Sequence, residues 1–151
     1  MGGEHIWKPE ATVATVVVRD GRLLLVEESI GGTLVLNQPA GHLEPDESLQ
    51  QAALRETLEE TGWQVRLTAF IGCYQWQAAG GRQFLRFAFA ADPLAHDPAR
   101  TLDEGIVRAL WMTPQELRAA GPRLRSPLVW QAAADWLGGR RFPLSLVEQV
   151  R

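Results

Sequence analysis

Three glutamates crowd the stretch "RETLEETG", which covers residues 55–62. Glu56, Glu59 and Glu60 fall within about one helical turn, where like charges three and four residues apart repel one another. A helix built for stability would alternate glutamate with lysine, yet the only lysine of the chain is Lys8. The carboxylates therefore either form a solvated face or bind a cation. Hard divalent cations such as Mg²⁺ prefer oxygen ligands, and a few carboxylates suffice when water and substrate phosphates complete the shell.

The segment around these glutamates is acidic within a chain that is otherwise rich in arginine. Residues 41–63 contain six acidic residues and one base, Arg55, whereas the whole chain carries a net charge of −3. An acidic patch in an arginine-bearing domain suits a metal site that receives a polyanion, and it also suits a solvated helix. The small net charge gives no reason to expect a nucleic-acid polymer as partner.

The glutamates need a helix if they are to share one face. The pattern predicts a helix from near Glu47 to Thr61, with Gly62 placed to end it. At roughly 100° per residue, the three carboxylates occupy one arc, and Leu54, Leu58 and Thr61 lie on the opposite side. We expect this second side to pack on a sheet.

Strand-like segments on both sides of the helix supply that sheet. Runs rich in β-branched and aromatic residues, separated by turn signals such as "DG", predict strands. They cover residues 11–19, 22–28, 33–37, 63–76, 82–90 and 106–112. A polar loop is expected over residues 92–105, and short helices begin near residues 113 and 126. The pattern predicts an α/β fold, with one domain over residues 1–151 and a mixed sheet.

Length and composition fit one water-soluble domain. The chain has 151 residues, 46% of them hydrophobic and 22% charged, as in an ordinary globular domain. The lone Cys73 rules out an internal disulfide framework and fits a reducing compartment. No apolar signal-peptide core and no run of membrane-spanning length is present in the sequence. We therefore expect a cytoplasmic protein without a membrane partner.

The spacing of the charged residues decides between a solvated face and a metal site. It resembles the Nudix box, the motif of the Nudix hydrolase superfamily, and this match is highly specific. The charged and glycine positions of the box are all filled, by Gly41, Glu47, Arg55, Glu56, Glu59, Glu60 and Gly62. Two hydrophobic positions depart mildly, with Thr57 where an aliphatic residue is usual and Trp63 where a smaller one is commoner. We expect these departures to affect packing only.

Strings outside the box extend the resemblance over most of the chain. "NQPAGHLE", "FLRFAF", "LRSPLV" and "RFPL" are similar to the NudJ branch of bacterial phosphatases within this superfamily. The resemblance implies a Nudix-type α/β/α sandwich around a mixed sheet and hydrolysis that depends on Mg²⁺, with Mn²⁺ as an alternative. It implies release of orthophosphate from nucleoside tri- and diphosphates and from hydroxymethylpyrimidine or thiamine pyrophosphate. The expected partner is a small pyrophosphate compound, and the expected assembly is a monomer or a homodimer.

The resemblance also assigns roles to residues of the box. A metal-activated water would attack phosphorus, with Glu56, Glu59 and Glu60 forming the metal face and the Ala40 carbonyl as a further ligand. Glu56 and Glu60, one turn apart, are the expected direct ligands. One helix glutamate would serve as base instead, and Glu59 is the candidate, although the sequence leaves this choice open.

Supporting residues are expected on both sides of the metal face. Arg55 and Glu47 would pair, so that Arg55 orients a metal-binding glutamate. Glu47 would also suit the first helical turn as a favourable charge. Gly41 would let the backbone approach the metal closely. A further acid outside the box, either Asp103 or Glu104, would complete the site, unless both lie in a solvated loop.

Three residues are candidates for binding the substrate. Trp76 would stack on a base or pyrimidine ring, or else pack in the core. Arg86, between two apolar residues of a strand, would point at a phosphate or else face solvent. Arg125 in "LRSP" has the same two interpretations.

Two other functions compete with this hypothesis. One is a Nudix pyrophosphatase of other specificity, acting on oxidised nucleoside triphosphates or ADP-ribose. The other is a non-enzymatic module that binds a nucleotide and regulates a partner. Such modules usually lose the helix glutamates, and all three are present here. The complete box therefore favours an enzyme.

Overall fold

The computed structural model describes residues 3–151, so the first two residues of the expected domain lie outside the described part. Its strands are β1 (Glu10–Arg19), β2 (Arg22–Ile30), β3 (Thr33–Asn37), β4 (Ala40–His42), β5 (Trp63–Gln77), β6 (Gln83–His96) and β7 (Ile106–Met112). Its α-helices are α1 (Leu49–Thr61), α2 (Pro114–Ala119) and α3 (Pro127–Leu137), and short 3₁₀ turns cover Gly121–Arg123 and Leu144–Leu146. Within residues 3–151, no helix combines the length and the apolar character needed to cross a membrane.

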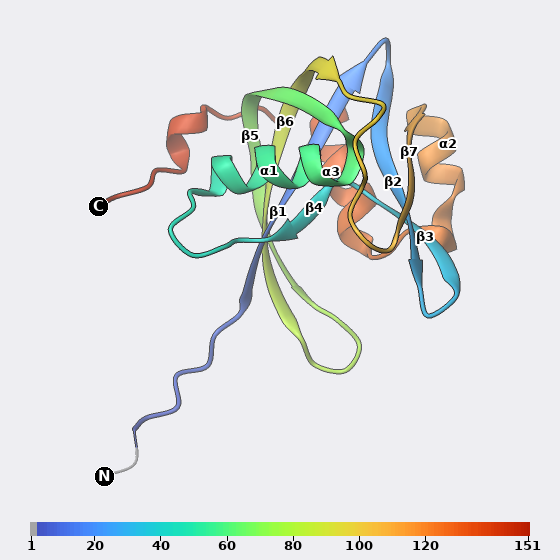
Figure 1. Cartoon of the computed structure of the whole chain (residues 1–151). Coiled ribbons are helices and arrows are strands. Elements are labelled where there is room, and N and C mark those ends of the chain that lie inside the picture. The colour runs from blue at the N-terminus through green and yellow to red at the C-terminus, as the bar shows by residue number, and fades with distance from the viewer. Residues whose placement is uncertain (1–2) are drawn as a thin grey trace.

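The order of the sheet follows from the hairpin of β1 and β2, whose strands pair only near the turn. Asp20 and Gly21 have φ angles of 51° and 73°, as a two-residue hairpin turn requires. Next to this turn β1 pairs with β2, and beyond it the two strands separate. β1 then pairs with β4 and, in parallel, with β6, whereas β2 pairs with β3 and β7. The result is a mixed sheet in the order β3-β2-β1-β6-β5 (Figure 1).

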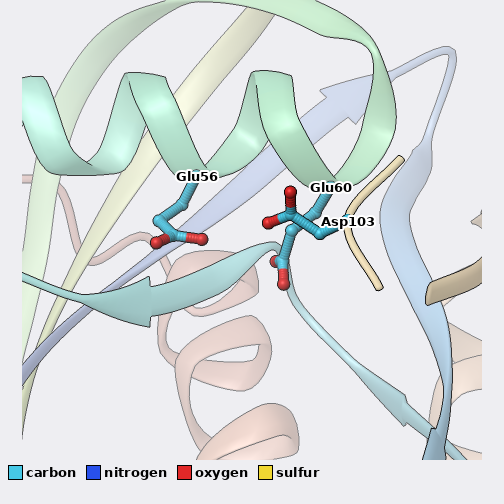
Figure 2. Close-up of side chains that lie close together, drawn as sticks. All are labelled: Glu56, Glu60 and Asp103. Carbon is cyan, nitrogen blue, oxygen red and sulfur yellow. The ribbon is translucent and has the colours of Figure 1, made fainter. Parts of the chain in front are cut away.

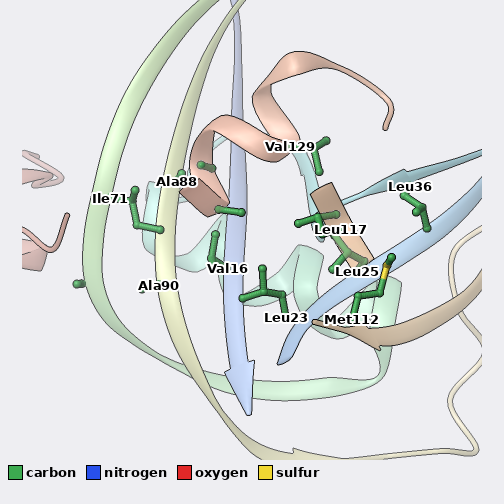
Figure 3. Close-up of a cluster of buried hydrophobic side chains, with 13 residues drawn as sticks. Val16, Leu23, Leu25, Leu36, Ile71, Ala88, Ala90, Met112, Leu117 and Val129 are labelled. Carbon is green, nitrogen blue, oxygen red and sulfur yellow. The ribbon is translucent and has the colours of Figure 1, made fainter. Parts of the chain in front are cut away.

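Helices cover both faces of this sheet. Because side chains alternate along a strand, Val13 of β1 packs with α1, and Val16 packs with α3. α1 lies across one face and α3 across the other (Figure 1). Figure 3 shows the larger cluster, in which Val16 and Ala88 of the sheet meet Val129 of α3. This arrangement confirms the predicted α/β/α sandwich.

The helix of the box begins two residues later than predicted. Ser48 caps it, because its hydroxyl accepts a hydrogen bond from the Gln51 N–H at 3.0 Å. Glu47 thus precedes the cap, and the idea that it acts as a charge in the first turn is wrong. The predicted end is confirmed, since Gly62 adopts the left-handed conformation with φ 75°.

The buried face of α1 also differs from the prediction. Leu54 was expected to pack on the sheet but is 38% exposed, and the side chains buried there are small, including Ala53, Thr57 and Thr61. Thr57 donates to the Ala53 carbonyl at 2.7 Å, so the Thr15 hydroxyl of β1, 2.8 Å away, donates to Thr57. Thr57, which stands where the box usually has an aliphatic residue, therefore has a hydrogen-bond partner on the sheet, Thr15.

Part of the predicted polar loop is strand. β6 continues to His96 and pairs with β5, where His96 stacks on Trp63 with ring centroids 4.6 Å apart. The remaining loop is attached to α1 at two places. The Asp97 N–H donates to the Gly62 carbonyl at 2.9 Å, and the Asp103 N–H donates to the Glu59 carbonyl at 3.1 Å. These bonds fix the position of Asp103 relative to the helix.

Candidate active site

Three carboxylates meet at the end of α1. Oxygen atoms of Glu56, Glu60 and Asp103 all lie within 4.8 Å of one another. Figure 2 shows the two glutamates projecting from α1 and Asp103 reaching them from the loop before β7. The structure thus brings Asp103 to the two expected direct ligands, whereas Glu59 and Glu104 are not members of this group.

Burial of Glu60, and partial burial of Glu56, makes their ionised forms unfavourable without a cation. Glu60 is 8% exposed, and burial raises the pKa of its carboxyl group to about 8. Burial also raises the pKa of Glu56, although Arg55 opposes the shift. Closely spaced buried acids resist ionisation together unless a positive charge compensates them. An all-oxygen set of carboxylates suits a hard divalent ion such as Mg²⁺ or Mn²⁺.

The backbone of β4 takes part in the same arrangement. The Ala40 N–H donates to Oε1 of Glu60 at 2.8 Å. The Thr15 N–H donates to the Pro39 carbonyl, and Val13 is paired with Gly41. Ala40, which lies between Pro39 and Gly41, therefore turns its N–H and its carbonyl away from β1. The Ala40 carbonyl is therefore outside the ladder with β1, as the role of a metal ligand requires.

Gly41 makes room for the Glu56 carboxylate. A Cβ atom at position 41 would lie 2.2 Å from Cδ of Glu56 and 2.3 and 2.4 Å from its two carboxylate oxygens. Any side chain at this position would thus occupy the place of that carboxylate. Glycine was expected here so that the backbone could approach a metal. In the structure the group that approaches the backbone of Gly41 is the Glu56 carboxylate itself.

Arg55 links the carboxylates through one guanidinium group. It binds Glu47 with two hydrogen bonds, Nε to Oε2 at 2.6 Å and Nη2 to Oε1 at 2.9 Å. Its Nη1 donates to Glu56 at 2.7 Å and to Glu59 at 3.3 Å. The pair of Arg55 and Glu47 is therefore present, and through it Glu56 is held in a fixed position. The same contact lowers the pKa of Glu47.

Replacing Arg55 with lysine tests this orienting contact. We expect the Arg55→Lys variant to lose about 10–100-fold in metal affinity or kcat/KM, because an ammonium group cannot reproduce the two-pronged bond to Glu47. Activity measured against Mg²⁺ concentration would show it. Arg66→Lys, at an exposed pair with Asp92, is the matched control. Equal Mg²⁺ dependence in both variants would contradict the assignment.

A cavity of about 520 Å³ opens beside the carboxylates. Glu60 and Ala40 line it together with the predicted substrate-binding residues Trp76, Arg86 and Arg125. Glu104 also lines it, so the loop acid that does not join Glu56 and Glu60 faces the cavity instead. The structure therefore collects all three substrate-binding candidates around one space next to the carboxylates.

Burial decides between the two interpretations for Arg86 alone. Arg86 is only 5% exposed, so it does not face solvent, and its Nη2 donates to Oδ1 of Asn37 at 3.0 Å. Trp76 is half-buried at the cavity, where its ring stacks on Phe84 with centroids 5.6 Å apart. Arg125 forms an ion pair with the buried Glu28, but its own side chain is 48% exposed, so it faces solvent as well as the cavity.

Several cavity residues were missed by sequence reasoning. Asn37 ends β3, Glu28 lies near the end of β2, and Phe84 belongs to β6. A buried apolar strand that ends in two glutamates, "LLLVEE", was the available signal for Glu28. Asn37 and Phe84 gave no comparable signal, because their partners are distant in sequence.

Known proteins resemble this chain in sequence and in fold. Residues 8–131 match the NUDIX domain family. The phosphatase NudJ of Escherichia coli strain K12 is 42% identical over 142 residues, which are 94% of this chain and 92% of NudJ. A NUDIX hydrolase from Nitrosomonas europaea is 46% identical, with a TM-score of 0.92 over 95% of this chain and 98% of that one. The solution structure of the E. coli ORF135 protein has the same fold at 24% identity, with a TM-score of 0.70 over 87% of this chain and 90% of that one.

The chain therefore belongs to the Nudix family. It is a hydrolase that acts on the pyrophosphate bonds of small molecules, and members of the family generally use a divalent metal ion. Among its relatives, NudJ is similar over nearly the whole of both chains.

Proposed function

We propose that the protein is a Mg²⁺-dependent hydrolase that releases orthophosphate from nucleoside tri- and diphosphates and from hydroxymethylpyrimidine or thiamine pyrophosphate. The observation that carries this proposal is the group of Glu56, Glu60 and Asp103 beside a cavity lined by a buried arginine and an aromatic ring. Similarity to a relative named as a phosphatase supports orthophosphate as the product. Mn²⁺ is the alternative ion.

In this proposal the carboxylates of Glu56, Glu60 and Asp103, with the Ala40 carbonyl, hold the metal ion. When bound, such an ion lowers the pKa of water and neutralises charge on phosphate oxygens. Glu59, whose side chain is 32% exposed and lies next to Arg55, accepts the proton of the attacking water. Glu59 thus lies next to the proposed metal ligands but outside their group.

The cavity residues orient the substrate in this proposal. Arg86 and Arg125 bind phosphate oxygens, because a guanidinium group matches their geometry. Trp76 stacks on the heteroaromatic ring. The acids bind the metal ion at one edge of the cavity, and the arginines balance the remaining charge of the pyrophosphate.

Product analysis tests the proposal. The purified protein would be incubated with hydroxymethylpyrimidine pyrophosphate, thiamine pyrophosphate and a panel of nucleotides, with and without Mg²⁺, and released orthophosphate and pyrophosphate would be measured separately. Mg²⁺-dependent orthophosphate release is the expected result. Pyrophosphate release from oxidised nucleoside triphosphates, or cleavage of ADP-ribose alone, would contradict the proposed substrates and indicate a Nudix pyrophosphatase of other specificity. Absence of turnover with binding of nucleotide would favour the regulatory module.

Removing the Trp76 ring tests the stacking contact. Stacking is worth about 1–3 kcal/mol per base, so we expect the Trp76→Ala variant to raise KM for nucleotides and the pyrimidine ester roughly tenfold or more. Inorganic tripolyphosphate has no ring, and its KM should stay unchanged. Trp7→Ala, which removes an exposed ring that does not line the cavity, is the control. A parallel rise in KM for tripolyphosphate would show that Trp76 acts on the fold instead.

A further inference from the structure

Arg86, a buried arginine of the cavity, has few hydrogen-bond acceptors for the N–H groups of its guanidinium. Arg86 is 5% exposed, and its Nη2 donates to Asn37 at 3.0 Å. Its Nε is buried and has no hydrogen-bond partner among the described residues. Buried polar groups nearly always have partners, so each exception calls for a reason. A ligand that brings its own acceptors is such a reason.

The charges around Arg86 leave it incompletely balanced. Glu60 and Glu28 lie close enough to favour its charged form, whereas Arg125 opposes it. Burial outweighs these contributions and lowers the pKa of Arg86 to about 10, so the group remains cationic at neutral pH. Glu28 already pairs with Arg125, and Glu60 belongs to the group of proposed metal ligands. The residue that contacts the guanidinium directly, Asn37, is neutral.

We propose that the neutral side chain of Asn37 determines anion recognition, because it positions the Arg86 guanidinium without neutralising its charge. This inference rests on the proposed function, and it names the phosphate group of substrate or product as the acceptor that Arg86 lacks. Both residues line the cavity beside Glu60. An aspartate at position 37 has almost the same shape, but it would give Arg86 a permanent counter-charge and compete with phosphate.

The proposal predicts opposite effects on binding and on stability. In the Asn37→Asp variant the buried guanidinium gains an ionic partner, so we expect the melting temperature to rise by about 2–4 °C. Affinity for orthophosphate should fall at least about tenfold, because a charge-assisted bond to the anion is replaced by one within the protein. A residue with a structural role alone would lose stability on substitution and would leave phosphate binding intact.

The test uses orthophosphate as the probe, titrated calorimetrically into the Mg²⁺-loaded protein, with melting temperatures measured in parallel. Asn37→Ser introduces no charge at this position, and its affinity should stay within a few-fold of wild type. Gln64→Glu adds the same charge at an exposed position of β5 and controls for net charge. The expected result is weak binding only in Asn37→Asp.

Three results would overturn the inference. One is equal orthophosphate affinity in wild type and Asn37→Asp, a second is equal weakening in Asn37→Ser, which would show that charge is not the cause, and the third concerns the Gln64→Glu control. Failure of the proposed function is distinguishable, because wild-type protein would then bind orthophosphate but hydrolyse none of the pyrophosphate compounds. Weak binding in the Gln64→Glu control would likewise contradict the inference, since any added negative charge would then suffice.

Discussion

Replacing Glu60 with glutamine is expected to abolish hydrolysis and yet to stabilise the metal-free fold. Glu60 is the most buried member of the carboxylate group, and the Ala40 N–H holds its Oε1 in place. Loss of a ligand forfeits several kcal/mol of transition-state stabilisation, so kcat should fall about 10³-fold or more. The amide keeps an oxygen for the Ala40 bond, so the local structure should persist.

The stability change should depend on pH in a defined direction. Burial raises the pKa of Glu60 in the metal-free folded protein to about 8, from an ordinary value of 4.5. Between these values the folded state keeps a proton that the unfolded state has lost, so the free energy of unfolding contributed by Glu60 falls as pH rises. Glutamine does not ionise and avoids this loss. The Glu60→Gln variant should therefore melt above wild type at pH 8, and the two should converge near pH 4.5.

Melting curves in the presence of a chelator, recorded from pH 4.5 to 8, would check this expectation beside steady-state kinetics with saturating Mg²⁺. Asp103→Asn is an informative companion, because Asp103 is exposed. It should lower activity without a comparable gain in stability. A Glu60→Gln variant that is less stable than wild type at pH 8 would show that burial does not strain this carboxylate.

Gly41→Ala is expected to lower activity strongly while leaving the fold nearly as stable as before. The added methyl group would stand 2.2–2.4 Å from the Glu56 carboxyl atoms, which must move. Those atoms are the end of a flexible side chain, and Gly41 lacks a positive φ angle, so an alanine fits the backbone there. Displacing a reacting group by about 1 Å can cost about 10²-fold in rate. We expect a loss of that size in kcat/KM.

Gly72→Ala is the matched control for this variant. Gly72 also lies in a strand, but its added Cβ would meet the Tyr74 ring at 3.5 Å, which is an ordinary contact. Activity and melting temperature measured on both variants separate the two effects. If Gly41→Ala retained full activity, the Glu56 carboxylate would not be needed where the structure places it.

The sequence could predict the box and its elements because their signals are local. Ser48 and Gly62 cap the helix within a few residues of its ends, and "DG" sets the first hairpin. The pairing of Arg55 with Glu47 followed from the fixed spacing of the box, although Glu47 lies just before the helix. Such features depend on contacts between near neighbours, which a linear pattern records.

The features that were mispredicted or missed depend on distant contacts. The apolar residue Leu54 was expected to be buried, but Thr57 is buried instead, because Thr15 lies opposite it on β1. Asp103 could not be separated from Glu104 until the backbone bond to Glu59 fixed which acid turns toward the helix. Asn37 became meaningful only when Arg86, from another strand, was found beside it.

The parallel ladder between β1 and β6 has a consequence for how the protein folds. It joins Glu10–Val17 to Phe84–Ala91, so a long loop that contains α1 must close before the ladder can form. Closing such loops is slow, because entropy is lost before the contacts compensate for it. Asp103 is separated from Glu56 and Glu60 by β5 and β6, so their group of carboxylates likewise forms only through long-range contacts. A metal ion held by these carboxylates would therefore bind the folded protein and not the folding transition state. It would slow unfolding without raising the folding rate.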